Sequence, residues 1–208
     1  MAMLEVVRIS KMFGKDVVLK NVTFSLKNGI LGIYGPNGSG KTTLLKIISG
    51  FEKPSCGWIF FNGKEITNMA PQKIVKLGIA MAFQIPRVFW NLTVYENVLL
   101  AAREKDYAME ICEELNIKDI LFKKANEISQ GKLKLLQLAL CFALKPKLAL
   151  LDEPFASLDA ENVEIVLDYL RRRGDEISMI ITAHRTKLLK GLASCMFEMR
   201  GGKIVRSS

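Results

Sequence analysis

Residues 35–42 read G-P-N-G-S-G-K-T. The pattern G-x-x-x-x-G-K-T predicts a phosphate-binding loop, because its glycines let successive backbone N–H groups point at phosphate oxygens. The apolar run 30–34 predicts a strand before the loop, and residues 42–49 predict a helix whose N-terminal end attracts anions. A chance glycine turn is the alternative, and these flanks argue against it. The candidate binding residues are Gly35, Pro36, Asn37, Gly38, Ser39, Gly40, Lys41, Thr42 and Thr43.

Two side chains of the loop have separate predicted roles. Lys41 is expected to reach the β- and γ-phosphates of a nucleoside triphosphate. The hydroxyl of Thr42 is expected to bind Mg²⁺. The loop therefore predicts triphosphate binding, without indicating how the energy of the nucleotide is used.

A second motif, L-A-L-L-D-E-P, occupies residues 148–154 and contains two acidic residues. Its four apolar residues predict a buried strand, and the end of a strand beside the phosphate loop is where a Mg²⁺-associated carboxylate belongs. Asp152 is the candidate for that carboxylate. Glu153 is then placed to polarise an attacking water as a general base. A helix cap or a surface ion pair is the alternative role for either side chain.

Size and composition fit one globular domain of 208 residues, half of them hydrophobic. No apolar run reaches the roughly 18 residues that a bilayer-spanning helix needs. The N-terminus lacks the pattern of a signal peptide, since Glu5 and Arg8 interrupt it. We therefore expect a cytosolic chain whose contact with a membrane depends on a partner.

Cysteine and charge usage narrow the class of protein further. The four cysteines stand far apart without a C-x-x-C pair, which excludes the usual zinc spacing, and we expect reduced thiols mostly packed as small apolar groups. The net charge of +9 would favour nucleotide, anionic lipid or nucleic acid. Because the basic residues are spread along the chain, apart from short clusters at 123–124 and 171–173, a solvated basic face is the simpler interpretation.

Strands alternate with helices along the chain, which predicts an α/β domain with a largely parallel central sheet. The predicted strands cover 4–9, 17–26, 30–34, 58–61, 78–83, 148–151 and 178–182, with a terminal hairpin over 196–205. The predicted helices cover 42–49, 133–144, 163–173 and 186–192, together with a helical face made by Ala108, Ile111, Cys112 and Leu115.

The order of three motifs along the chain resembles the order found in a known protein family. The loop at 35–42 is followed by I-S-Q-G-K at 128–132 and by the acidic motif at 148–154. In this order they resemble the ATPase subunit of an ATP-binding cassette (ABC) transporter, over nearly the whole chain. The resemblance implies a P-loop NTPase core with an antiparallel β subdomain and an α-helical subdomain, and ATP and Mg²⁺ as ligands. It divides the single domain into core plus β subdomain (1–84), helical subdomain (85–145) and core (146–208).

Residues 128–132 resemble the signature loop of this family, whose usual form is L-S-G-G-Q. Ser129 and Gly131 are retained, and the resemblance implies that they donate hydrogen bonds to the γ-phosphate across a dimer. Gln130 and Lys132 depart from the usual form. Taken without the other motifs, Ser129 is an ordinary N-cap for the helix that follows.

Further positions match loops of the same family. Gln84 resembles the glutamine that senses Mg²⁺ and water, and His184 resembles the switch histidine that contacts the γ-phosphate. Phe13, in M-F-G, resembles the aromatic residue that stacks on adenine. Ser157-Leu158-Asp159 matches the loop that crosses the dimer interface, and Asp159 also suits an N-cap. A surface glutamine, a structural histidine and a core phenylalanine are the alternatives.

Residues 77–98 are similar to ATPase subunits of branched-chain amino-acid importers. The resemblance implies an ATP-hydrolysing subunit on the inner face of the cell membrane, paired with a second ATPase subunit and docked on a transmembrane permease. No nucleic acid partner is expected. The resemblance assigns catalysis to Glu153, His184, Gln84 and Lys41, and the metal to Thr42, Gln84 and Asp152.

Two rival interpretations come from other classes. A soluble ABC ATPase acting in DNA repair, iron–sulfur assembly or translation is favoured only by the positive charge. A P-loop kinase leaves the loops at Ser129 and Asp159 without an explanation.

Overall fold

The computed structural model describes residues 2–184 and 186–206. Its central sheet has the strand order β10-β9-β3-β8-β7-β6, and neighbouring strands are parallel except in the β9–β10 hairpin. Every residue of β7 and β8 is buried, as expected for parallel strands that are covered on both faces. The strands are β3 (Ile30–Tyr34), β6 (Ile79–Ala82), β7 (Leu148–Asp152), β8 (Ser178–Ala183), β9 (Cys195–Arg200) and β10 (Lys203–Arg206).

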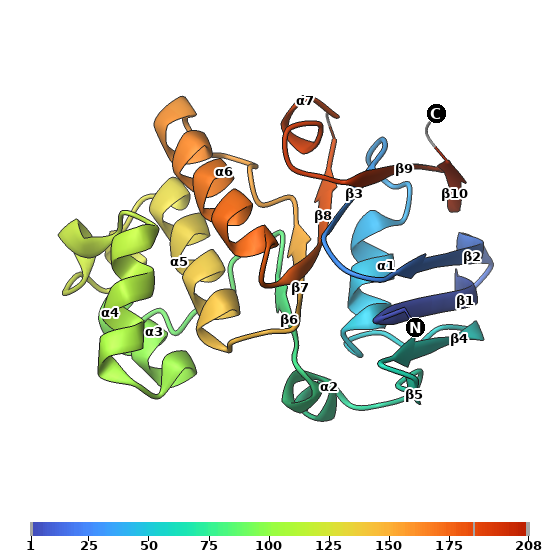
Figure 1. The fold of residues 1–208 in the computed structure, drawn as a ribbon, viewed down its shortest axis with the longest axis horizontal. Helices are drawn as coiled ribbons and strands as arrows, with labels where there is room; N and C mark the ends of the chain where they lie inside the picture. Colours follow the sequence, from blue (N-terminus) through green and yellow to red (C-terminus); the bar gives the residue numbers. More distant parts are fainter. Residues whose placement is uncertain (1, 185, 207–208) are drawn as a thin grey trace.

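A second, antiparallel sheet has the order β2-β1-β4-β5. The pairing of β1 with β2 shifts register more than once, and Arg8 and Asn21 adopt positive φ angles of 51° and 53° near these irregularities. Figure 1 shows this sheet at one end of the molecule, across α1 from the central sheet. Its strands are β1 (Leu4–Phe13), β2 (Asp16–Leu26), β4 (Cys56–Phe61) and β5 (Lys64–Glu65).

The helix α1 (Lys41–Ile48) joins the two sheets into one core. Leu44, Leu45, Ile47 and Ile48 of this helix are buried, and they pack in one apolar cluster with residues of both sheets. The segment between β3 and α1 is therefore held at one end by the central sheet and at the other end by the packed helix α1. This rigid attachment fixes the position of the phosphate loop.

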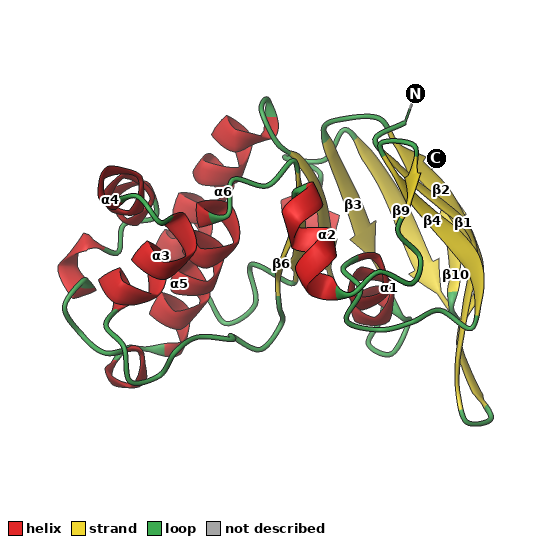
Figure 2. Ribbon diagram, turned by 90° about the horizontal axis from the view of Figure 1, so that it is seen from below, coloured by secondary structure: helices red, strands yellow, loops and turns green. Residues whose placement is uncertain are grey.

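The remaining helices lie mostly on the other side of the central sheet, where Figures 1 and 2 show α3, α4 and α5 packed together at the far end. Ten residues of α5 are buried, including the polar residues Lys134 and Gln137, so most of the surface of this helix is covered. These elements are α2 (Pro71–Leu77), α3 (Val94–Ala102), α4 (Lys105–Glu114), α5 (Gln130–Ala143), α6 (Ala160–Gly174) and α7 (Thr186–Leu189), with 3₁₀ turns at Lys118–Ile120 and Ala125–Glu127.

The predicted architecture is confirmed, and the differences have local causes. The helix α2 was not predicted, although Pro71 stands at its start and Gly78, with φ 102°, ends it. The helix α5 begins three residues earlier than predicted because the side chain of Ser129 caps it. The last helix is shorter than predicted and ends at Leu189. The subdomain boundaries at 84/85 and 145/146 stay a prediction.

Two expectations about side chains need correction. Cys112 and Cys141 are buried, but Cys56 and Cys195 are exposed, so packing as small apolar groups holds for only half of the thiols. The basic cluster 171–173 is not simply solvated, because Arg173 lies 2.5 Å from a carboxylate oxygen of Glu114 and joins α6 to α4. None of the helices in the described part is both long and apolar enough to cross a membrane.

Candidate nucleotide site

The phosphate loop lies between the end of β3 at Tyr34 and the start of α1 at Lys41. Glycine is required at Gly35, because a Cβ there would lie 2.1 Å from the carbonyl oxygen of Met199. Glycine is also favoured at Gly40, whose φ is 102°. The loop therefore follows the predicted strand–loop–helix order, with its backbone close-packed against β9.

A cavity of about 250 Å³ opens over this loop. Most of its lining belongs to the loop and the first turn of α1, where N–H groups at a helix N-terminus favour anions. Gln84 and Glu153 reach the same cavity from the ends of β6 and β7. Its lining residues are Val18, Asn37, Gly38, Ser39, Gly40, Lys41, Thr42, Thr43, Gln84 and Glu153.

Lys41 provides the cation of the cavity. The residue is only 4% exposed, and Nζ donates to the carbonyl oxygens of Gly35 at 2.8 Å and Pro36 at 3.1 Å. Burial lowers the pKa of Lys41, and the nearby carboxylates of Glu153 and Asp152 partly offset this effect. Glu153 Oε1 lies 3.9 Å from the ammonium. The cavity thus holds one buried cation next to a buried anion.

Asp152 is fixed at the end of β7 by a residue that sequence reasoning missed. Thr182, its partner across the β7–β8 pairing, donates from Oγ1 to Asp152 Oδ1 at 2.8 Å. The same hydroxyl accepts a hydrogen bond from the backbone N–H of Glu153 at 3.0 Å. One threonine therefore orients both acidic residues. Its signal in the sequence was only a polar residue inside a predicted apolar strand.

Glu153 is the point where three predicted side chains meet. Its φ of 50° is uncommon for a residue with a side chain, and the residue is 7% exposed. Its Oε1 lies 2.8 Å from His184 Nε2, and its Oε2 accepts from Gln84 Nε2 at 3.4 Å. The strand ends of β6, β7 and β8 thus bring Gln84, Glu153 and His184 to one place.

The donor set fits a magnesium nucleotide. Among the described residues, Ser39 Oγ and Asp152 Oδ2 are buried without a hydrogen-bond partner, and both lie at the edge of the phosphate loop. Thr42, Gln84 and Asp152 line a smaller adjoining cavity of about 120 Å³. Hydroxyl, amide and carboxylate oxygens are the ligands that Mg²⁺ prefers.

Five of the predicted binding residues do not line the phosphate cavity, namely Gly35 and Pro36 of the loop itself, Phe13, Ser129 and Gly131. Phe13 lies at the end of β1 and is 46% exposed, with Lys11 Nζ 4.6 Å from the centre of its ring. In the same hairpin, Val18 lines the cavity and was not predicted. Ser129 and Gly131 lie at the start of α5, and a Cβ at Gly131 would sit 3.8 Å from Ser157.

The signature loop has the geometry of a capped helix. Ser129 Oγ accepts from the backbone N–H of Lys132 at 3.3 Å, so the capping alternative is confirmed. Lys132, a departure from the usual loop, turns away and donates to Asn116 O at 2.8 Å and Asp119 Oδ1 at 3.2 Å. Asp159 likewise caps α6 by accepting from Asn162 N. Ser129 and Asp159 are both exposed, so the two capped loops lie at the surface.

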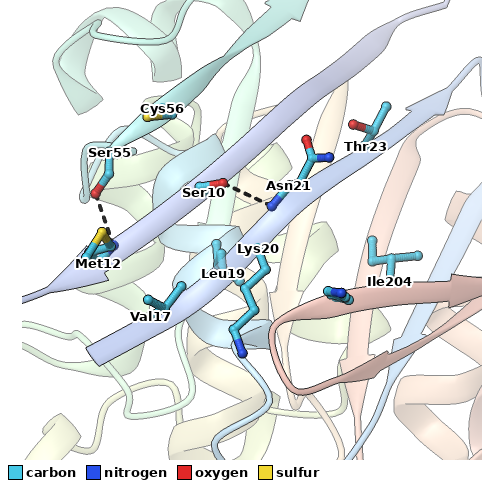
Figure 3. Close-up of a pocket in the computed structure, with 11 residues that line it drawn as sticks. Ser10, Met12, Val17, Leu19, Lys20, Asn21, Thr23, Ser55, Cys56 and Ile204 are labelled. Carbon is cyan, nitrogen blue, oxygen red and sulfur yellow. Dashed lines mark hydrogen bonds between the residues drawn. The ribbon is translucent and has the colours of Figure 1, made fainter. Parts of the chain in front are cut away.

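A larger groove of about 590 Å³ lies elsewhere, along β2 and β10 (Figure 3). Its three hydroxyls each accept a backbone hydrogen bond, Ser10 from Asn21 N and Ser55 from Met12 N at 3.0 Å, and Thr23 from Arg8 N at 2.9 Å. No carboxylate lines it. The groove therefore lacks the paired acid, base and phosphate loop of the smaller cavity, which is the better candidate for chemistry.

Comparison with known proteins agrees with this site. The family model described as ABC transporter matches residues 19–156. A phosphonates import ATP-binding protein of Oceanobacillus iheyensis is 33% identical over 99% of this chain and 89% of its own length. A probable branched-chain amino acid transport ATP-binding protein of Archaeoglobus fulgidus is 31% identical over 99% and 88%.

A solved structure extends the likeness to three dimensions. The ADP conformation of an ATP-binding cassette of an ABC transporter is 28% identical, covers 100% of this chain and 92% of its own, and has a TM-score of 0.87. The family model covers well over half of the chain and includes both the phosphate loop and the acidic strand end. The chain therefore belongs to the ABC transporter family, as one of its ATP-binding and ATP-hydrolysing cassette subunits.

Proposed function

We propose that this cassette powers solute transport by a partner membrane permease, by binding and hydrolysing ATP in the cavity over its phosphate loop. One observation carries the proposal. The buried carboxylate of Glu153 stands at the mouth of the phosphate loop, 2.8 Å from His184 and within hydrogen-bond distance of Gln84. A base, its orienting partners and a phosphate cradle in one cavity suit hydrolysis of a nucleoside triphosphate.

Binding comes first. The N–H groups of residues 37–43 and the Lys41 ammonium hold the phosphates, because the loop and the helix end present donors and a cation to anions. Thr42, Gln84 and Asp152 would hold Mg²⁺, which would supply positive charge to the triphosphate, and Phe13 would stack on the adenine.

Hydrolysis then depends on Glu153. Its carboxylate accepts a proton from water as the water oxygen bonds to the γ-phosphorus and the bond to the ADP oxygen breaks. Gln84 and His184 keep the carboxylate aimed at this position through its two oxygens. The backbone N–H of Glu153, bonded to Thr182, fixes the unusual φ angle that points the side chain into the cavity.

The site is completed by a second ATPase subunit. Ser129 and Gly131 do not line the phosphate cavity of their own chain. Paired head to tail, each chain would offer the Ser129 hydroxyl and the N–H groups at the start of α5 to the γ-phosphate bound by the other. ATP then holds the pair closed, and hydrolysis reopens it. The partner is a copy of this chain or a paralogue.

The permease docks beside Gln84 and the helical segment. Ile85, Phe89 and Trp90 follow Gln84 directly and are exposed, as is Phe51 nearby. Exposed apolar side chains in one segment mark an interaction surface. Gln84 is the first residue of this exposed segment and also contacts Glu153. The segment that would touch the permease is therefore linked directly to the catalytic base. The chain would then lie in the cytoplasm, at the inner face of the cell membrane.

The solute is not fixed by this chain. The relatives are named for phosphonates and for branched-chain amino acids at nearly equal identity. We therefore propose transport without a particular solute.

The test is a pull-down of the tagged chain from detergent-solubilised native membranes. Recovery of a polytopic membrane protein in stoichiometric amount, with ATPase activity in the purified complex, would support the proposal. A soluble partner or nucleic acid recovered with nothing from the membrane would contradict it. That result would move the cassette to repair, iron–sulfur assembly or translation.

A further inference from the structure

A buried lysine joins the signature helix to the catalytic strand ends. Lys134 lies on α5, one turn beyond Gly131, and is 3% exposed. Its Nζ donates to the backbone carbonyl oxygens of Gln84 at 3.0 Å and Phe83 at 3.2 Å, and it lies 3.4 Å from Asp152 O. One ammonium therefore bridges the ends of two neighbouring strands, β6 and β7.

The next turn of α5 extends the same attachment. Gln137 donates from Nε2 to Ile85 O at 3.4 Å. Together the two side chains bind the carbonyls of residues 83, 84 and 85 in succession. These three residues lie just beyond the end of β6 at Ala82, where strand pairing no longer holds the backbone. The helix therefore replaces a strand partner for the segment that contains Gln84.

Burial of the ammonium is costly unless its donors are satisfied. Lys134 has no carboxylate within ion-pair distance among residues 2–184 and 186–206, and three carbonyl dipoles take that place. Burial lowers the pKa of Lys134 to about 8, against the attraction of Asp152 and Glu153. An apolar residue would fill the space without this cost but would leave the carbonyls unpaired.

We propose that Lys134 is a positioning residue for ATP hydrolysis, which sets the backbone of Gln84 and Asp152 from the helix that begins at Ser129. The inference rests on the proposed function. Gln84 contacts Glu153 through its side chain, and Asp152 directly precedes Glu153, so both neighbours of the base are held by one ammonium. A shift of α5 on binding a second subunit then reaches the base through Lys134.

The space around Lys134 allows a clean exchange. A cavity of about 220 Å³ lies between the start of α5 and the loops after β6 and β7, and Lys134 lines it together with Gln84 and Ser157. An arginine at this position has the cavity beside it for its larger guanidinium and keeps a charged donor. Lys134→Arg and Lys134→Met therefore separate the charged hydrogen bonds from side-chain bulk.

The experiment measures phosphate release and ATP affinity for the wild type, Lys134→Met and Lys134→Arg. Lys134→Met is expected to lower kcat by about 10- to 100-fold, since small displacements of catalytic groups have effects of this size. The Kd for ATP is expected to stay within about threefold, because Lys41 and the loop are untouched. Lys134→Arg is expected to recover most of the turnover. Lys145→Met, at an exposed position just beyond the end of α5, is the matched control and should keep wild-type kcat.

Circular dichroism and thermal melting check the fold of each variant. Should Lys134→Met not fold, Lys134→Gln takes its place with the same expectation. A folded variant with kcat within about twofold of the wild type would overturn the proposal. So would equal losses of kcat and ATP affinity, or a Lys134→Arg protein no better than Lys134→Met. If the wild type and Lys145→Met also fail to hydrolyse ATP, the hydrolytic function itself is wrong, and the positioning role is lost with it.

Discussion

Replacement of Glu153 by glutamine isolates the proton-accepting role of this residue. The amide has nearly the same shape as the carboxylate, so it can keep contacts with Gln84 and His184, which lie 3.4 and 2.8 Å from its two oxygens. Glu153 is only 7% exposed, and it is the one carboxylate among the described residues that line its cavity. What the variant loses is a group able to accept the proton of water.

The expected loss follows from that single change. General base catalysis contributes about 10²- to 10⁴-fold, which is about 3–5 kcal/mol of activation free energy. ATP affinity should be equal or higher, because the substitution removes an anion 3.9 Å from Lys41 at the site of the triphosphate. The variant is thus predicted to lose turnover while its affinity for ATP stays equal or rises.

The assay is phosphate release at saturating ATP, with Kd measured separately using a fluorescent ATP analogue. Glu65→Gln is the matched control, since Glu65 is exposed on β5 and remote from the cavity. It should retain wild-type values of both constants. Near-normal turnover in Glu153→Gln would refute the assignment of the base. Loss of turnover together with equal loss of ATP affinity would show a binding role instead.

Further outcomes test the adenine contact and the buried lysine. Phe13→Ala should weaken ATP binding by about 1–3 kcal/mol with little change in kcat, Phe13→Trp should restore it, and exposed Phe122→Ala should have no effect, all by ligand titration. The pKa of Lys134 is lowered from 10.5 to about 8 in the folded chain. Between about pH 8 and pH 10.5 the unfolded chain therefore keeps a proton on Lys134 that the folded chain has lost. The free energy of unfolding consequently rises with pH across this range. From pH 7 to 9.5, urea denaturation with EDTA should show the wild type gaining about 2 kcal/mol over Lys134→Met. A constant difference across this range would contradict the buried, charged lysine.

The sequence predicted those parts of the site that lie within one short stretch of chain. The phosphate loop, Asp152 and Glu153 each stand in a motif whose residues are neighbours along the chain, so their roles follow from local spacing. The parallel sheet followed from alternating strands and helices, and its strand ends bring these motifs together. The meeting of Gln84 and His184 at Glu153 agrees with the family resemblance.

The residues that were missed act through tertiary register. Thr182 orients Asp152 only because β8 pairs with β7, and Val18 reaches the cavity only because the β1–β2 hairpin packs beside the loop. Lys134 looked like one charged residue in an apolar helix. Its function depends on two strand ends about 50 and 18 residues away in sequence. No local pattern encodes such contacts.

The departure of the signature loop from its usual form has a structural explanation within the chain. Lys132 binds Asn116 and Asp119, and so fastens the start of α5 to the neighbouring 3₁₀ turn. The hydroxyl of Ser129 is engaged in capping, as is common at helix starts. A role in binding a second subunit's nucleotide must therefore use the hydroxyl's remaining capacity and the nearby N–H groups.

Mixing two inactive variants tests the composite site most directly. Lys41→Ala removes the cation of the phosphate loop, and Ser129→Asp keeps a good N-cap while placing an anion where the partner's γ-phosphate is proposed to lie. Each variant alone should lack ATPase activity. Because the two substitutions fall on different halves of one site, a mixed pair keeps one intact site, and an equal mixture should recover about a quarter of wild-type activity. An inactive mixture of two folded variants would contradict the head-to-tail pair and place the whole reaction within one chain.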